Sequence, residues 1–216
     1  PWKTVDVLLV AQERSLAAPR FGTGKRKGPA LAVTRTRIVI VGAGTAGLAA
    51  LREIRDQTDD FILINDGPYG TTCARVGCMP SKALIAAANA FHARSRLETF
   101  GINGAENLTA DIPGVMKRVR ALRDDFVSGV LRATDGLGAR NIAGRARLDG
   151  PNRVIVGNQV IEADRIILAP GSSPIVPGPW KQLGDRVFTT DSFFELEDLP
   201  RRIGVIGLGA IGALAS

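Results

Sequence analysis

The feature that most constrains the fold is the stretch RIVIVGAGTAGLAALREI, residues 37–54. A β-branched run, Ile38 to Val41, predicts a buried strand, and the segment after the glycines favours a helix. FILIN, residues 61–65, predicts a second buried strand, which makes a βαβ unit of about thirty residues. Between the first strand and the helix lie three glycines in the GxGxxG spacing: Gly42, Gly44 and Gly47.

Each of these glycines has its own physical task in a dinucleotide-binding turn. The first makes the tight turn, the second lets the backbone approach a pyrophosphate, and the third lets the helix pack on the strand. The phosphates would lie at the helix N-terminus, where free N–H groups and a partial positive charge attract an anion. The strand, turn and helix together predict a dinucleotide site.

A second glycine turn follows a short apolar strand near the end of the chain, in RRIGVIGLGAIGALAS, residues 201–216. Two such turns in one chain predict two dinucleotide sites. The second domain is expected to be cut off after its first strand and turn. Its glycines are Gly207, Gly209 and Gly212.

Between the turns, the hydrophobic pattern predicts one helix from about Cys78 to Arg94 and a second from Asp111 to about Leu131. After these helices the period changes toward two. Residues 141–165 predict a small antiparallel meander with a turn at 149–152, followed by a buried strand, Ile166 to Ala169.

The totals indicate a globular protein, since 45% of the 216 residues are hydrophobic and 23% are charged. No apolar run approaches the roughly 18 residues of a membrane span. The net charge of +7 belongs mostly to residues 1–37, which carry eight basic and two acidic side chains. The neutral remainder argues against a nucleic-acid or membrane partner.

Residues 1–36 are interpreted as a basic, disordered leader, because glycine, proline and basic residues follow one short apolar run. Organellar import is one interpretation of this leader. However, the leader contains Asp6 and Glu13 and lacks a clear amphipathic helix. A cytoplasmic location is therefore expected.

Both cysteines of the chain lie in TTCARVGCMPSK, residues 71–82, as Cys73 and Cys78. They could form an inert pair, a metal clip or a redox-active pair. No metal site is expected, because two thiols and the single histidine, His92, give at most three soft ligands. Cys78 starts a predicted helix, whose partial positive charge at the N-terminus stabilises a thiolate. The position favours a redox-active pair.

Four segments in this order, GAGTAGLAA, CARVGCMPSK, ILAPGSSP and GVIGLGAIG, resemble the flavoprotein disulfide reductases, most closely the dihydrolipoamide dehydrogenases. The resemblance runs from about Arg37 to the end and covers roughly the first half of a full-length member. It implies an α/β fold: a Rossmann-like FAD-binding domain with a small β meander over residues 37–185. A crossover and the truncated start of a Rossmann-like NAD(P) domain would follow over residues 186–216.

The resemblance also implies roles for single residues. Cys78 would be the sulfur next to the flavin, and Cys73 the outer sulfur that exchanges with a substrate disulfide or dithiol. Lys82 would direct its ammonium group toward the flavin and stabilise negative charge on it. The implied cofactor contacts, besides Lys82, are Gly42, Gly44, Thr45, Ala46, Gly47, Asn65, Asp66, Gly70, Thr71, Thr72, Ala169, Gly171 and Ser172 for FAD, and Gly207, Gly209 and Gly212 for NAD or NADP.

Three residues depart from the family pattern. Asn65, followed by Asp66, stands where an acidic residue binds the FAD ribose, and a neutral acceptor is weaker than a carboxylate. Pro170 replaces a threonine near the cofactor. Leu214 stands where a glutamate usually pairs with the lysine equivalent to Lys82.

The expected function is an FAD-dependent, NAD(P)H-linked dithiol/disulfide oxidoreductase that uses Cys73 and Cys78. A mercuric or glutathione reductase-like activity is the alternative within the family. Family members are homodimers whose C-terminal domain supplies a His–Glu acid–base pair to the partner, and this domain is expected to be absent here. A truncated fragment that binds a nucleotide without catalysis is therefore the second hypothesis.

Overall fold

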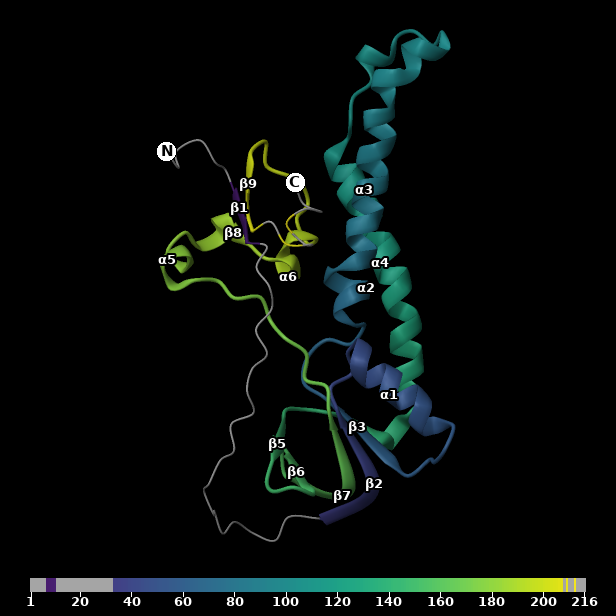
Figure 1. Ribbon diagram of the computed structural model, residues 1–216, viewed down its shortest axis with the longest axis vertical. Helices are drawn as coiled ribbons and strands as arrows, with labels where there is room; N and C mark the ends of the chain where they lie inside the picture. Colours follow the sequence, from purple (N-terminus) through teal and green to yellow (C-terminus); the bar gives the residue numbers. More distant parts are fainter. Residues whose placement is uncertain (1–6, 11–32, 208, 210–211, 213–216) are drawn as a thin grey trace. The chain divides into compact units, whose positions relative to one another are not determined.

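A computed structural model of the chain describes residues 7–10, 33–207, 209 and 212. The chain divides into two compact units (Figure 1). Unit 1 comprises residues 1–15, 73–126 and 173–216, and unit 2 comprises residues 16–72 and 127–172.

Unit 2 is built on a six-stranded sheet in the order β4-β3-β2-β7-β6-β5. Strands β4, β3, β2 and β7 run parallel to one another, and β6 runs antiparallel to both of its neighbours, β7 and β5. The sheet is therefore a parallel nucleotide-binding core extended by a meander. The strands are β2 (Val33–Val41), β3 (Phe61–Asn65), β4 (Asn141–Ala143), β5 (Ala146–Leu148), β6 (Arg153–Val156) and β7 (Gln159–Leu168).

Side chains alternate across this sheet, and residues 38–41 of β2 together with β3 lie between apolar clusters on both faces. On one face, Ile40, Phe61 and Leu63 pack with Leu51 and Ile54 of helix α1 (Thr45–Arg55). On the other face, β2 and β3 pack against apolar residues of β6 and β7; this cluster is Val39, Ile62, Ile64, Val154, Val156, Ile161 and Ala163. The continuous apolar runs of β2 and β3 follow from burial on both sides.

Unit 1 contains the two cysteines and a three-stranded parallel sheet in the order β8-β1-β9. Phe193 and Phe194 pack there against Val119 and against Ala83 and Leu84 of the helix that follows the cysteines. The strands are β1 (Val7–Val10), β8 (Val187–Phe188) and β9 (Ile203–Ile206).

Helices α2 (Thr72–Val76) and α3 (Cys78–His92) carry the cysteines. The long helix α4 (Ile112–Asp135) contributes residues 112–126 to unit 1 and the remainder to unit 2. The shorter helices are η2 (Ala93–Phe100), η3 (Ala105–Asn107), η4 (Gly138–Arg140), α5 (Gly178–Lys181), η5 (Gly184–Arg186) and α6 (Thr190–Phe193).

Three sequence predictions differ from the structure. The leader was expected to be unstructured through residue 36, but Val7–Val10 form β1 and β2 already begins at Val33. The strand Asn141–Ala143 pairs in parallel with β3 and does not belong to the antiparallel meander. A strand of three residues has no periodicity from which its direction could be predicted. Its direction is therefore determined by the strand with which it pairs.

Among the described residues, no helix is long and apolar enough to cross a membrane.

Candidate functional site

The first glycine turn connects β2 to α1 in unit 2, and its geometry leaves no room for side chains at two positions. Gly42 has φ +106° and donates its N–H to the carbonyl of Ile64 at 2.7 Å. A Cβ added to Gly42 would lie 2.0 Å from the carbonyl oxygen of Ala169, and one added to Gly47 would lie 1.8 Å from that of Gly42. Both glycines are therefore required for close backbone packing.

Gly44 differs from its two neighbours in the motif, because a Cβ added there would meet no atom of the described residues within 4 Å. Gly44 is also the N-cap of α1, and no side chain caps this helix end. The first turn contains no acidic residue, and Thr45 and Ala46 are exposed. Open space in front of uncapped N–H groups fits the pyrophosphate of a dinucleotide.

The end of β3 contacts the glycine turn through Asn65. Its side-chain oxygen accepts the N–H of Ala43 at 3.0 Å, and its side-chain nitrogen donates to the carbonyl of Gly67 at 3.0 Å. The side chain thus joins the loops after β2 and β3. The neighbouring Asp66 is exposed and carries the carboxylate at this edge.

The end of β7 completes the same edge of the sheet. Ala169 donates its N–H to the carbonyl of Val41 at 2.8 Å, which places it beside the glycine turn. Gly171 has φ +71° and is exposed, and Ser172 is half-buried. The carboxyl ends of β2, β3 and β7 therefore bring together most of the predicted FAD contacts in unit 2, as is usual for ligand sites in parallel sheets.

The segment Gly70 to Thr72 leads from unit 2 toward the cysteines. Gly70 is buried with φ +117°, and Thr71 has φ +63°. Thr71 is the only residue other than glycine with positive φ among the described residues. A β-branched side chain in this conformation stores strain, which proteins retain mostly at functional sites. The sequence does not reveal this conformation, because threonine usually avoids it.

The cysteines lie on two successive helices in unit 1. Cys73 is on α2 and Cys78 is the first residue of α3, whose N-cap is Gly77. Ser81 donates its hydroxyl to the carbonyl of Gly77 at 2.7 Å and so holds the start of α3. Both cysteines are free thiols; Cys73 is half-buried and Cys78 is exposed. Access and proximity suit thiol–disulfide exchange.

The electrostatics of the pair distinguish its two thiols. A hydrogen bond with the Cys78 side chain is the main cause that raises the pKa of Cys73, with smaller contributions from burial and from the charge of Cys78. The positive charge of Lys82 acts in the opposite direction and lowers the pKa of Cys73. Lys82 lies four residues after Cys78 on α3, on the same helix face. The two sulfurs are thus close enough to interact.

The second glycine turn follows β9 in unit 1. Gly207 has φ +106°, the same value as Gly42. A Cβ added to Gly209 would meet no atom of the described residues within 4 Å, and Gly212 is buried. Residues 208, 210 and 211 lie outside the described part of the chain, and so does Leu214.

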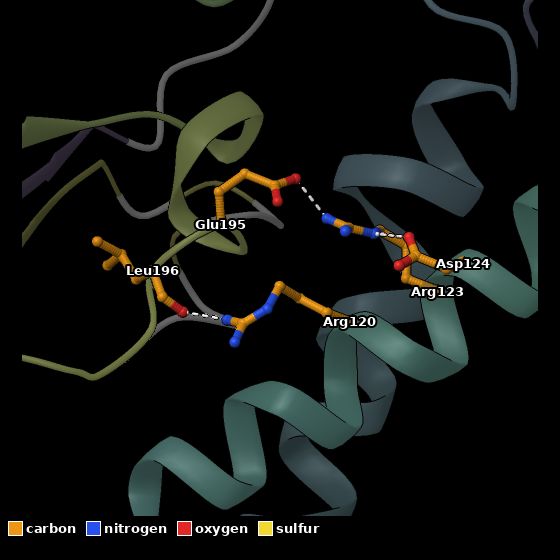
Figure 2. A network of polar contacts seen from close by, with 5 residues as sticks. All are labelled: Arg120, Arg123, Asp124, Glu195 and Leu196. Atoms are coloured by element: carbon orange, nitrogen blue, oxygen red, sulfur yellow. Dashed lines mark hydrogen bonds and ion pairs between the residues drawn. The ribbon is translucent and has the colours of Figure 1, made fainter.

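A polar network in unit 1 was not predicted from the sequence. Arg123 of α4 forms ion pairs with Asp124 at 2.9 Å and with Glu195, and Arg120 donates to the carbonyl of Leu196 (Figure 2). Burial by itself lowers the pKa of Arg123, but the hydrogen bonds that Arg123 donates to Asp124 and Glu195 outweigh burial and raise this pKa. Because the partners lie 72 and 76 residues apart, helical spacing gives no signal for these contacts.

The network lies next to the apolar cluster that holds the cysteine helix. Phe193 and Phe194 precede Glu195 directly, and both pack with Ala83 and Leu84 of α3. The network therefore fixes the segment against which helix α3 is packed. Within the described ranges, no group of three or more His, Cys, Asp or Glu side chains could hold a metal ion. His92 is exposed at the end of α3.

Two named relatives are similar in sequence to most of this chain. It is 35% identical over 181 residues to a dihydrolipoyl dehydrogenase of Chlamydia pneumoniae, which covers 81% of this chain and 38% of the relative. It is 32% identical over 184 residues to a mercuric reductase of Shigella flexneri, with 81% and 32% covered. The chain thus spans about two fifths or less of these relatives' length.

A solved structure has the same fold. The Cu(II) complex of the HOCl-induced flavoprotein disulfide reductase RclA from Escherichia coli superposes with a TM-score of 0.65 at 22% identity, covering 84% of this chain and 39% of that one. Residues 36–215 match the pyridine nucleotide-disulphide oxidoreductase family. The match extends over most of the chain and includes both glycine turns and the cysteine pair, so the chain belongs to the pyridine nucleotide-disulphide oxidoreductase family.

Proposed function

We propose that this chain is the FAD-binding and redox part of an NAD(P)-linked dithiol/disulfide oxidoreductase, most similar to dihydrolipoyl dehydrogenase. The observation that carries the proposal is the pair Cys73 and Cys78, two interacting thiols at the start of α3 in a chain that also has two glycine turns. Membership of the family implies FAD and NAD(P) as cofactors.

The first turn would hold FAD. Its pyrophosphate would lie over Gly44 and the N–H groups of Thr45 and Ala46, because this helix end is open and uncapped. Asp66 would supply the acidic group for the ribose, since both functional atoms of Asn65 already bind the loop backbone. The other proposed contacts are Gly42, Gly47, Gly70, Thr71, Thr72, Ala169, Gly171 and Ser172.

The cysteine pair would exchange with a dithiol substrate. A substrate thiolate attacks one sulfur of the Cys73–Cys78 disulfide, and the second substrate thiol completes the exchange. The substrate leaves as a disulfide, and the protein keeps two thiols with the two electrons. Bound FAD would accept these two electrons and pass them to NAD(P)⁺. Half-buried Cys73 would keep its proton longer than an ordinary thiol, because Cys78 raises its pKa.

Lys82 would keep positive charge on the cysteine face of α3. Its charge already acts on Cys73, and the side chain follows Cys78 by one helical turn. A fixed ammonium group stabilises the thiolate that attacks or leaves during exchange. We further propose that residues 37–185 are the FAD-binding domain and that residues 186–216 are the crossover and the start of the NAD(P) domain. The full-length protein would form a homodimer, as the resemblance implies.

A visible spectrum of the purified chain tests the proposal. The chain is mixed with FAD, freed of unbound flavin and then treated with dihydrolipoamide or NADH. We expect retained flavin and, on reduction, a long-wavelength band from a thiolate next to the flavin. Cys78→Ser should abolish this band, and Cys73→Ser should keep it.

Three results would decide between the hypotheses. A colourless protein would rule out FAD binding by this chain. Retained flavin without any band would favour a nucleotide-binding fragment that does not catalyse. Reduction of Hg²⁺ by the protein with NADPH, together with no reduction of the flavin by dihydrolipoamide, would favour the mercuric reductase-like alternative. The relative from Shigella flexneri suggests this alternative.

A further inference from the structure

The strand β1 lies far from the rest of unit 1 in sequence but occupies the centre of its sheet. It pairs in parallel with β9 on one side, from Val7 opposite Ile203 to Val10 opposite Ile206. On the other side it pairs in parallel with β8, through Leu8 opposite Val187 and Leu9 opposite Phe188. Among the described residues, strands β8 and β9 are therefore joined only through β1.

The pairing of β1 with β9 repeats the pairing of β7 with β2 in unit 2. In unit 2, Leu168 lies opposite Val41, the residue immediately before Gly42. In unit 1, Val10 lies opposite Ile206, the residue immediately before Gly207. Each strand that leads into a glycine turn thus has a parallel neighbour that ends level with it.

The glycines after the two strands also share a conformation, because Gly42 and Gly207 both have φ +106°. In unit 2, the strand neighbour shapes the turn directly, since the carbonyl oxygen of Ala169 lies where a Cβ of Gly42 would be. The two turns therefore share the φ angle of the first glycine and the register of the neighbouring strand, as far as the described residues reach.

The sheets of unit 1 and unit 2 also differ, and the differences show which strand position β1 shares with β7. Strand β6 runs antiparallel to β7, whereas β8 runs parallel to β1. The other side of β2 is occupied by β3, whereas β9 is an edge strand among the described residues. Only the position beside the glycine strand is equivalent, and β1 occupies it.

We propose that the N-terminal strand Val7–Val10 completes the sheet of a second dinucleotide-binding unit and is a structural part of the site at Gly207. Without β1, the backbone N–H and C=O groups of the two-residue β8 and the four-residue β9 would lose the strand partners that they have among the described residues. Two such short strands are not stable by themselves. The identity of the ligand as NAD(P) rests on the proposed function; the strand pairing does not.

Engineered disulfides test the register. In a Cys73→Ser/Cys78→Ser background, Val7→Cys with Ile203→Cys joins register partners, and Val7→Cys with Val205→Cys is the control displaced by two residues. We expect the first pair to form an intramolecular disulfide under mild oxidation and the control to remain reduced. Equal cross-linking in both variants, or a disulfide between two copies of the chain, would overturn the proposal.

Hydrogen exchange gives a second test that needs no cysteine. Leu8→Pro removes a backbone donor from a central strand, whereas Leu8→Thr keeps strand propensity. We expect the amides of Gly204 to Ile206 to exchange about tenfold faster or more in Leu8→Pro, and at the original rate in Leu8→Thr. Unchanged protection in Leu8→Pro would refute the pairing. Neither test uses a nucleotide. Both would therefore still test the pairing of β1 with β9 if the protein proved not to bind FAD or NAD(P).

Discussion

The side chain of Asn65 connects to the backbone of Ala43 by a hydrogen bond of 3.0 Å, and its amide group donates to Gly67 at 3.0 Å. An amide can accept and donate at once, whereas an ionised carboxylate can only accept. The asparagine that stands in the place of a family acid is therefore also a structural link between two loops of unit 2.

Replacing Asn65 should therefore lower stability. Asn65→Ala leaves the Ala43 N–H and the Gly67 carbonyl without their partner, at a cost of about 1–3 kcal/mol in the free energy of unfolding. The matched control is Asp66→Ala, which changes an exposed side chain and should cost less than about 0.5 kcal/mol. Urea unfolding measures both values. Equal costs would show that the Asn65 link does not contribute to the fold.

Substitutions at two glycines of the first turn should separate folding from nucleotide binding. The methyl group of Gly44→Ala meets no atom within 4 Å in the described part of the chain, so the fold should survive. The same methyl group should displace the phosphate and weaken FAD binding about tenfold or more. Gly42→Ala forces a Cβ against the carbonyl of Ala169 and should unfold unit 2. Circular dichroism and FAD titration distinguish the two effects. If Gly44→Ala still bound FAD tightly, the first glycine turn would not be the site that binds the phosphates.

The ion pairs of Arg123 should stabilise unit 1, because only 11% of its side chain is exposed. Arg123→Met removes the partner of Glu195 and should cost about 1–3 kcal/mol. Arg52→Met is the control, since that ion pair is 78% exposed on its arginine side and should contribute less than about 0.5 kcal/mol. Thermal unfolding at low and high salt measures both. Similar losses at the two sites would contradict a structural role for the network.

Cys73 should become more reactive when Cys78 is removed. The Cys78 side chain raises the pKa of Cys73 by a hydrogen bond and by its charge, so Cys78→Ala lowers this pKa and increases the thiolate fraction at a fixed pH. Alkylation of Cys73 by iodoacetamide should then follow a pH profile shifted to lower pH. Cys78→Ser keeps a hydrogen-bonding group and should shift the profile less. A profile that does not move would show that the thiols do not interact.

The sequence predicts the first glycine turn well, because its spacing, the β-branched run before it and the helix after it all specify one structure. The bounds of β3 and the start of α3 are also predicted, since FILIN is continuously apolar and Gly77 separates two helices. These features are local in the chain, so periodicity and turn chemistry determine them.

Non-local features could not be predicted in the same way. The four apolar residues of β1 look like an isolated run within a polar leader, and their partners lie almost 200 residues away. The ion pair between Arg123 and Glu195 and the double hydrogen bond of Asn65 likewise depend on tertiary packing. Thr71 adopts a conformation that its residue type disfavours, so propensity predicts the opposite.

We expect Cys73 and Cys78 to form a reversible redox pair, which a redox titration of the protein measures. The full chain is equilibrated in buffers of defined reduced and oxidised glutathione, free thiols are trapped by alkylation, and the products are measured by mass spectrometry. We predict one intramolecular disulfide between Cys73 and Cys78, with a midpoint of about −180 to −300 mV, the range of dithiol exchange centres. A pair that stays reduced under oxidising buffers, or that forms disulfides only between chains, would show that Cys73 and Cys78 are not a redox pair.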